Sequence, residues 1–260
     1  MAKLSEHHGS KFIKLAFIGN SGTGKTGALV SLLKAGYNLR ILDLDNGLDA
    51  LREWAKVECP DKLVNVDYET RRDKYKASSG GIVLSGQPKA FTDSLKLFDK
   101  WSDESLPRQW GTDTILVVDS LSAYGKAAFE WAKGMNPGAK DPRQWFYAAQ
   151  QAVEDTVAML TGEEFETNVI IISHVTYDEW QDGTVKGSMS AVGKALGPKL
   201  AKYLNTLVLA EAQGSGTNVK RTIRTAPTTV IDLKTPGPGF EVTLPLSTGL
   251  ADIFKKLKAA

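Results

Sequence analysis

The stretch Gly19-Asn20-Ser21-Gly22-Thr23-Gly24-Lys25-Thr26 satisfies the pattern G-x-x-x-x-G-K-[ST] at every fixed position. An apolar strand candidate, residues 12–18, precedes it, and a helix-like run, residues 26–35, follows it. In such a loop the glycines let successive N–H groups turn onto phosphate oxygens, and the helix N-terminus adds a positive dipole end. We therefore predict a P-loop that binds phosphate; the alternative is a chance match in a glycine-rich loop.

The predicted ligand of this loop is a nucleoside triphosphate, ATP, together with Mg²⁺. Lys25 would reach the β- and γ-phosphates, and the Thr26 hydroxyl would hold the metal. The residues predicted to contact the nucleotide are Gly19, Asn20, Ser21, Gly22, Thr23, Gly24, Lys25, Thr26 and Gly27.

The chain has 260 residues, 42% hydrophobic and 24% charged, which is the composition of an ordinary globular protein. We predict one domain over residues 1–260, with a flexible leader at 1–11 and a docked amphipathic helix at 250–258. The single cysteine, Cys59, excludes an internal disulfide. Because the sequence shows no signal peptide and no apolar run of about 18 residues, we expect a cytoplasmic protein without membrane contact.

The net charge of +2 is unevenly distributed along the chain. Residues 183–231 carry +6 and the rest of the chain −4. This asymmetry predicts a surface that faces a polyanion. The alternative is that acidic side chains from other segments neutralise these cations in space.

Short apolar runs alternate with helix-like segments, which predicts an α/β fold whose central sheet is mainly parallel and flanked by helices. The strand candidates are 12–18, 39–43, 114–120 and 168–174. The β-rich segments 205–212, 220–225 and 241–246 predict an antiparallel C-terminal extension. Ligands bind at the carboxyl ends of parallel strands, so we expect the polar residues at these ends to meet at one nucleotide.

Carboxylates and a histidine stand at those strand ends. Asp119 follows a buried strand and is the Walker B candidate that would hold the metal; the alternative is a helix cap. Asp43 and Asp45 lie one residue apart, so on a continuing strand both would point at the γ-phosphate, with Asp45 as general base. Their alternative role is a turn with Asn46-Gly47. His174 would sense the γ-phosphate or serve as a structural histidine.

The segments GNSGTGKT, RILDLDNGLDAL, TILVVDS, VIIISH and TLVLAEA, with VKRTIRT, resemble the RecA-like recombinase core in order and spacing. They are most similar to phage-encoded short RecA-like ATPases that anneal single strands, the Sak-type group. The resemblance covers most of residues 12–226. Where that family has a catalytic glutamate this chain has Asp45, and where it has a glutamine that couples nucleotide to DNA this chain has His174.

The resemblance further implies a site completed by a basic residue of the neighbouring subunit and two DNA-binding loops. Arg224 falls near that basic position, ahead of Arg221 and Lys220. The first loop would be 125–145 and the second 176–191. The DNA-contacting residues expected in or beside the second loop are Tyr177, Trp180, Lys186 and Lys194. The basic segment 71–76 is interpreted as solvated surface.

Taken with the P-loop, the resemblance implies an ATP-dependent single-stranded-DNA-binding ATPase that promotes annealing or strand exchange. It would act as a homo-oligomer, with single-strand-binding or other recombination proteins as further partners, in the cytoplasm of the host cell if phage-encoded. The alternatives are a hexameric DNA motor, a P-loop kinase, and a nucleotide-switched regulator of a protein partner.

Overall fold

An eight-stranded sheet forms the centre of the computed structural model, which describes residues 11–259 apart from the side chain of Thr217. The strand order is β12-β11-β10-β1-β7-β6-β2-β3. The strands are β1 (Lys14–Gly19), β2 (Asn38–Asp43), β3 (Val66–Thr70), β6 (Gly111–Asp119), β7 (Thr167–Ser173), β10 (Thr206–Gln213), β11 (Lys220–Arg224) and β12 (Thr243–Pro245). The predicted leader, 1–11, lies outside the described residues except for its last position.

Pairing is parallel from β10 through β3, and β11 and β12 pair antiparallel at the C-terminal end. The predicted mainly parallel sheet with an antiparallel C-terminal extension is therefore confirmed. In this order β7 lies between β1, which leads into the P-loop, and β6, which ends at Asp119. The carboxyl ends of these parallel strands share one edge, which is where a ligand is expected.

Each central strand sends alternate residues into two apolar cores, one on each face of the sheet. In β1, Ala16 and Ile18 belong to one core, and Leu15 and Phe17 belong to the other. A strand buried on both faces needs apolar residues at consecutive positions, and this explains why the central strands read as unbroken apolar runs.

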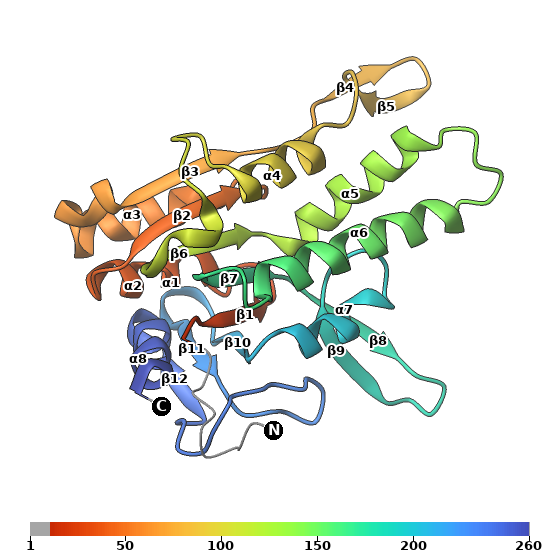
Figure 1. The fold of residues 1–260 in the computed structure, drawn as a ribbon. Helices are drawn as coiled ribbons and strands as arrows, with labels where there is room; N and C mark the ends of the chain where they lie inside the picture. Colours follow the sequence, from red (N-terminus) through yellow and green to blue (C-terminus); the bar gives the residue numbers. More distant parts are fainter. Residues whose placement is uncertain (1–10, 260) are drawn as a thin grey trace, which may run out of the picture.

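Helices cover both faces of the sheet (Figure 1). One face packs against α1 (Lys25–Ala28), α2 (Val30–Lys34), α3 (Leu48–Glu58) and α8 (Leu246–Ala259), and the other against α4 (Ala90–Asp99), α5 (Leu121–Met135), α6 (Arg143–Thr161) and α7 (Leu196–Leu200). Short 3₁₀ helices occupy Pro60–Asn65, Pro107–Gln109, Ala201–Tyr203 and Gly216–Asn218. The predicted C-terminal helix is α8, whose Leu250, Ile253 and Phe254 are buried. Among residues 11–259, no helix is both long enough and apolar enough to cross a membrane.

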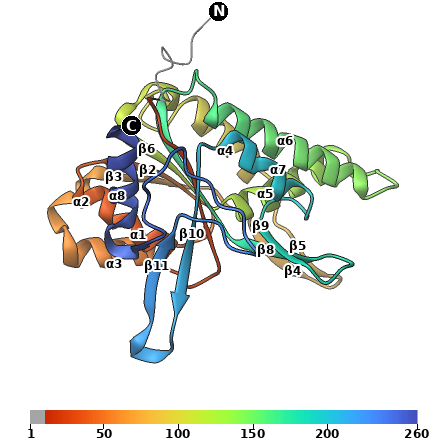
Figure 2. The same ribbon diagram turned by 90° about the horizontal axis from the view of Figure 1, so that it is seen from below.

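The β-hairpins β4–β5 and β8–β9 and the helical hairpin α5–α6 project in the same direction (Figures 1 and 2). The strands of these hairpins are β4 (Tyr75–Ser78), β5 (Gly81–Leu84), β8 (Val175–Glu179) and β9 (Val185–Met189). Both β-hairpins are two-stranded sheets separate from the central one.

Two segments that we predicted as loops are regular structure. Residues 125–145 form most of α5, a turn and the start of α6, because Ala128 and Ala132 pack at helical spacing into the core. Residues 176–191 form the β8–β9 hairpin, in which Tyr177 pairs with Gly187. Gly138 and Gly183 lie in the turns, whereas Gly125 and Gly134 lie within α5 and Gly187 within β9, so glycine content did not separate turns from regular structure.

Candidate nucleotide site

The P-loop connects β1 to a helical run that begins at Lys25 and continues through α2. Gly22 and Gly24 have φ angles of 79° and 88°, a region that favours glycine. Gly19 is required for a different reason, because a Cβ there would lie 2.6 Å from the carbonyl oxygen of Ala210. The local chain therefore needs glycine at the positions fixed by the motif.

Lys25 lies inside this loop rather than in solvent. It is 7% exposed, and its Nζ donates hydrogen bonds to the carbonyl oxygens of Gly19 at 2.8 Å and Asn20 at 2.9 Å. Burial lowers the pKa of Lys25, while the carboxylates of Asp119 and Asp45 raise it. An ammonium held only by carbonyls in a desolvated loop is suited to receive phosphate oxygens, which carry a full negative charge.

Thr26 and Asp119 meet at the end of β6. The Thr26 hydroxyl donates to Asp119 Oδ2 at 2.7 Å, and Asp119 is 3% exposed. Burial raises the pKa of Asp119 to about 6; the carboxylates of Asp45 and Asp43 add to this, and the Thr26 hydroxyl and Lys25 oppose it. A desolvated carboxylate beside a hydroxyl is the kind of oxygen pair that takes a hard cation, with the other positions left to water and phosphate. The residues therefore fit Mg²⁺.

Gly47 lies beside the contact between Thr26 and Asp119, although its sequence context indicated only a turn. A Cβ on Gly47 would lie 3.2 Å from Thr26 Oγ1 and 3.5 Å from Asp119 Oδ2. Its φ of −93° is open to any residue, so space beside the hydroxyl and the carboxylate is what requires glycine here. The described part of the chain holds no cluster of three or more His, Cys, Asp or Glu that could bind a metal, here or elsewhere, so the predicted Mg²⁺ position rests on Thr26 and Asp119.

The expectation that Asp43 and Asp45 point together is wrong. β2 ends at Asp43 and the chain bends at residues 44–46, so the strand alternation stops there. The Asp43 carboxylate accepts from Arg72 and from the Asn46 N–H, the latter at 2.9 Å. It lines a cavity of about 450 Å³ on the other side of the turn 43–47, which we call the acidic turn.

Asp45 faces the P-loop instead. Its Oδ2 lies 3.4 Å from His174 Nε2. Both side chains line a pocket of about 470 Å³ together with Lys25, Thr26 and Asp119. The remaining lining residues are Ser21, Gly22, Gly24, Gly27, Gly47 and Ala50. The structure thus brings together the predicted metal, base and sensor residues and most of the predicted phosphate-binding residues, whereas Gly19, Asn20 and Thr23 do not line this pocket.

Arg224 does not lie in this pocket. Its Nε forms an ion pair with Glu211 Oε2 at 3.0 Å, across the β10–β11 pair. Arg221, on the same strand, does reach the P-loop of its own chain, because its Nε donates to the Gly22 carbonyl at 3.3 Å. The role of Arg224 in a neighbouring subunit stays a prediction.

The predicted DNA-contacting residues lie on or next to the β8–β9 hairpin, which begins one residue after His174. Tyr177 and Trp180 are exposed. The two lysines have acidic neighbours, because Lys194 pairs with Asp178 at 2.7 Å and Lys186 lies 3.8 Å from Asp232. The aromatic side chains are therefore more available to a ligand than the charges are.

Comparisons with known proteins give one family model and similar solved structures. The family model of an AAA domain matches residues 11–236. Two similar solved structures are a KaiC-like protein of Pyrococcus horikoshii and the flagellar accessory protein FlaH of Methanocaldococcus jannaschii. The first is 13% identical, with a TM-score of 0.40 and coverage of 82% of this chain and 80% of that one. The second is 11% identical, with a TM-score of 0.44 and coverage of 88% and 83%. No curated protein matches the sequence.

Proposed function

We propose, from the premise that this chain belongs to the AAA domain family of P-loop ATPases, that it hydrolyses ATP and binds single-stranded DNA under the control of the nucleotide. One observation carries the proposal. The pocket that holds Lys25, Thr26, Asp119 and Asp45 also contains His174, the residue that leads into the β8–β9 hairpin. A residue of the nucleotide pocket, His174, thus directly precedes the first residue of the hairpin that carries the exposed aromatic side chains.

The hydrolytic part of the proposal assigns a role to each pocket residue. The P-loop N–H groups and Lys25 would bind the β- and γ-phosphates, and Thr26 and Asp119 would hold Mg²⁺. The metal would neutralise charge that develops on the phosphate oxygens. Asp45 would orient the attacking water and accept its proton. The charge on Asp119 suits the metal role, because a buried carboxylate gains most from a cation beside it.

The DNA part of the proposal rests on the contact between His174 and Asp45. A γ-phosphate in the pocket would compete with His174 for space and hydrogen bonds near Asp45, and His174 is continuous with β8. Tyr177 and Trp180, exposed on the hairpin, offer flat surfaces on which bases stack without sequence preference. The excess positive charge of residues 183–231 is partly neutralised in the fold, because Lys186, Lys194 and Lys202 pair with carboxylates outside that segment. Only the remaining excess supports a polyanionic ligand.

We propose further that the protein acts as a homo-oligomer in annealing or strand exchange, as the resemblance to phage recombinases implies. In such an assembly Arg224 would leave Glu211 to meet the nucleotide of a neighbouring subunit. Proteins of replication and recombination would be its other partners.

The experiment is ATP hydrolysis by the purified protein with and without single-stranded DNA at two salt concentrations, with Lys25→Ala as the control. We expect DNA to stimulate turnover and salt to weaken the stimulation, because counterion release drives backbone binding. Turnover that is indifferent to DNA would contradict the DNA part. Turnover that survives Lys25→Ala would contradict the nucleotide part.

A second candidate, a nucleotide-switched regulator that binds a protein, is favoured by one observation. Ile82, Met135 and Tyr147, on the projecting hairpins, are large apolar or aromatic side chains and each is at least 70% exposed. Exposed apolar groups gathered on one side are typical of a protein-binding surface. In the same experiment this candidate predicts slow turnover and no response to DNA.

A further inference from the structure

A small cleft lies between the root of the β4–β5 hairpin and α5. Its volume is about 70 Å³, and Arg71, Arg72, Tyr75 and Lys126 line it. Asp73 also lines the cleft, but its Oδ1 already accepts from the N–H groups of Lys89 and Ala90 at 2.8 and 3.0 Å. The cleft is therefore lined by three cations and one carboxylate, and that carboxylate already accepts two backbone hydrogen bonds.

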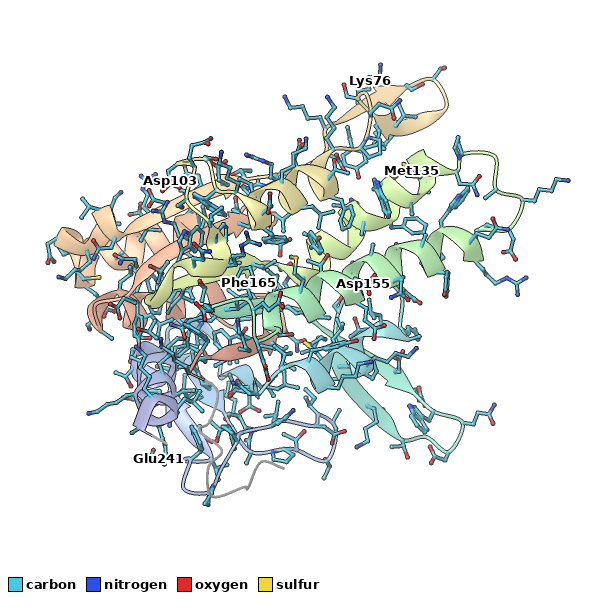
Figure 3. All side chains as sticks on the ribbon, in the orientation of Figure 1. Lys76, Asp103, Met135, Asp155, Phe165 and Glu241 are labelled. Carbon is cyan, nitrogen blue, oxygen red and sulfur yellow. The ribbon has the colours of Figure 1, made fainter. Side chains whose placement is uncertain are left out.

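The cations around this cleft divide into paired and unpaired groups. Arg71 pairs with Glu69 and Arg72 with Asp43. Lys126 forms no ion pair within residues 11–259, and its Nζ lies 4.9 Å from the centre of the Tyr75 ring. Lys74 and Lys76, on the same hairpin, likewise have no carboxylate partner within this range. Figure 3 shows Lys76 on the hairpin. Lys126, Lys74 and Lys76 are thus the cations near the cleft that are available to an anion, whereas Asp73 and Glu130 are the carboxylates that act on Tyr75.

Tyr75 gives the site a second property. Its ring is 43% exposed and lies between the hairpin and Lys126. An aromatic face held beside a cation suits a ligand that carries a phosphate next to a flat ring. The hairpin also projects in the same direction as β8–β9 (Figures 1 and 2), so one extended strand could contact both.

We propose that this cleft binds a phosphate of a single-stranded nucleic acid, with the adjacent base on Tyr75, and that the β4–β5 hairpin is a second contact for the strand. The inference rests on the proposed function, because it extends the DNA-binding surface from β8–β9. Lys126 supplies the unpaired charge and Tyr75 the stacking surface.

The site is joined to the nucleotide pocket through the acidic turn. Arg72 pairs with Asp43 and donates from Nη1 to Asn46 Oδ1 at 2.9 Å. The Arg71 N–H donates to the Asp43 carbonyl at 3.2 Å, and Leu44 lines the cleft. A strand in this cleft would therefore touch one side of the acidic turn while the nucleotide touches the other through Asp45.

The test measures binding of a fluorescently labelled oligothymidine by anisotropy over a series of salt concentrations. The variant is Lys126→Gln and its control is Lys256→Gln. Lys256 is matched to Lys126, since its Nζ also lies 4.9 Å from an aromatic ring, that of Phe240, and within residues 11–259 it has no ion pair. It lies on α8, on the opposite side of the molecule from the β4–β5 hairpin (Figure 1).

We expect Lys126→Gln to weaken binding about 3- to 10-fold and to lower the salt slope by about 0.7, the loss of one phosphate contact on a single strand. Tyr75→Leu should weaken binding to a similar extent without changing the slope, because it removes stacking and keeps the charge. Lys256→Gln should match the unchanged protein in both quantities.

Equal affinity in Lys126→Gln and Lys256→Gln would overturn the inference. If Trp180→Ala weakens binding in the same assay, the proposed function stands and only this site fails. If the unchanged protein binds no oligothymidine, the DNA part of the proposed function fails with it. A thermal shift by inorganic phosphate that is lost in Lys126→Gln, with strand binding unaltered, would assign the cleft to free phosphate and overturn the strand assignment.

Discussion

In the nucleotide pocket Lys25 and Asp119 are buried and already hydrogen-bonded, whereas the aromatic side chains of the projecting hairpins stand in solvent. Asp45, in the same pocket, is exposed. Lys25 and Asp119 are 7% and 3% exposed, and Trp180 and Tyr75 are 63% and 43% exposed. Side chains that are held in place before the ligand arrives lose little conformational freedom on binding. This suits catalysis, which requires the reacting groups to be positioned accurately. Exposed aromatic side chains lose conformational entropy when a ligand orders them, but they can adapt to many ligands.

The two β-hairpins differ in how they join the pocket. Arg72 links β4–β5 to Asp43, and His174 links β8–β9 to Asp45. Only the second carboxylate faces the nucleotide pocket. The hairpin next to Asp45 should therefore respond to the γ-phosphate directly, and the hairpin next to Asp43 through the backbone of the acidic turn. Changes in the pocket should alter nucleotide chemistry, and changes in the hairpins should alter DNA affinity alone.

Among effects on ATP binding, the largest is expected from Lys25→Ala. It should weaken ATP binding by about 100-fold or more, because it removes the cation that meets the β- and γ-phosphates. The melting temperature should stay the same or rise, since burial disfavours the ammonium in the free protein. Calorimetric titration with ATP and a thermal melt measure both. A variant that melts far lower would show that Lys25 holds the loop together rather than the ligand.

Asp45→Asn should retain ATP and lose about 100- to 10,000-fold in hydrolysis, the usual contribution of a positioned base. Asp43→Asn is the matched control two residues away. It breaks the contact with Arg72 and should leave turnover much less affected, because Asp43 does not line the nucleotide pocket. Single-turnover hydrolysis compares the two. Equal losses in the two variants would mean that Asp43 and Asp45 both contribute to hydrolysis, although only Asp45 lines the nucleotide pocket.

Gly47→Ala tests the corner that the turn leaves open for the metal. The added methyl would stand 3.2 Å from Thr26 Oγ1, so hydrolysis should fall about 100-fold through misplacement of the metal or phosphate. Gly237→Ala is the control, because a Cβ there meets nothing within 4 Å. The Mg²⁺ concentration needed for half-maximal turnover should rise only in Gly47→Ala. An unchanged Mg²⁺ requirement would place the metal elsewhere.

The pH dependence of Mg²⁺-ATP binding should report Asp119, whose pKa burial raises to about 6 from 3.8. Below pH 6 the carboxyl gains a proton, so affinity should fall about 10-fold for each further pH unit. The stability has the opposite sign: the raised pKa stabilises the fold at low pH, and this contribution is lost as the pH rises from about 4 through 6. Mg²⁺-ATP affinity and melting temperature, both measured between pH 4 and 7, test whether binding and stability change in opposite directions. A binding midpoint near 3.8 would mean that Asp119 is not desolvated.

The sheet and the pocket could be predicted from the sequence because their signals are local. The P-loop is contiguous. Asp119 directly follows a short β-branched apolar run that is typical of a buried strand, and His174 follows another after Ser173. The role of Arg72 could not be predicted, since its partner Asp43 lies 29 residues away and only the fold brings them together. The role of Gly47 was hidden for the same reason, because its neighbours belong to α1 and β6.

The smallest effect is expected from the double variant Trp180→Ala with Lys186→Ala. DNA affinity should fall about 10-fold, mostly from lost stacking, because Asp232 already offsets part of the Lys186 charge. ATP affinity should not change, since neither residue lines the pocket. The control is the double variant Tyr68→Ala with Lys62→Ala. Tyr68 is an exposed aromatic residue of β3, and Lys62, in the 3₁₀ helix before β3, lies 3.7 Å from the Asp61 carboxylate. If both double variants bind DNA equally, the β8–β9 hairpin does not contribute specifically to DNA binding. The pocket and the hairpins would then differ only in how exposed their side chains are.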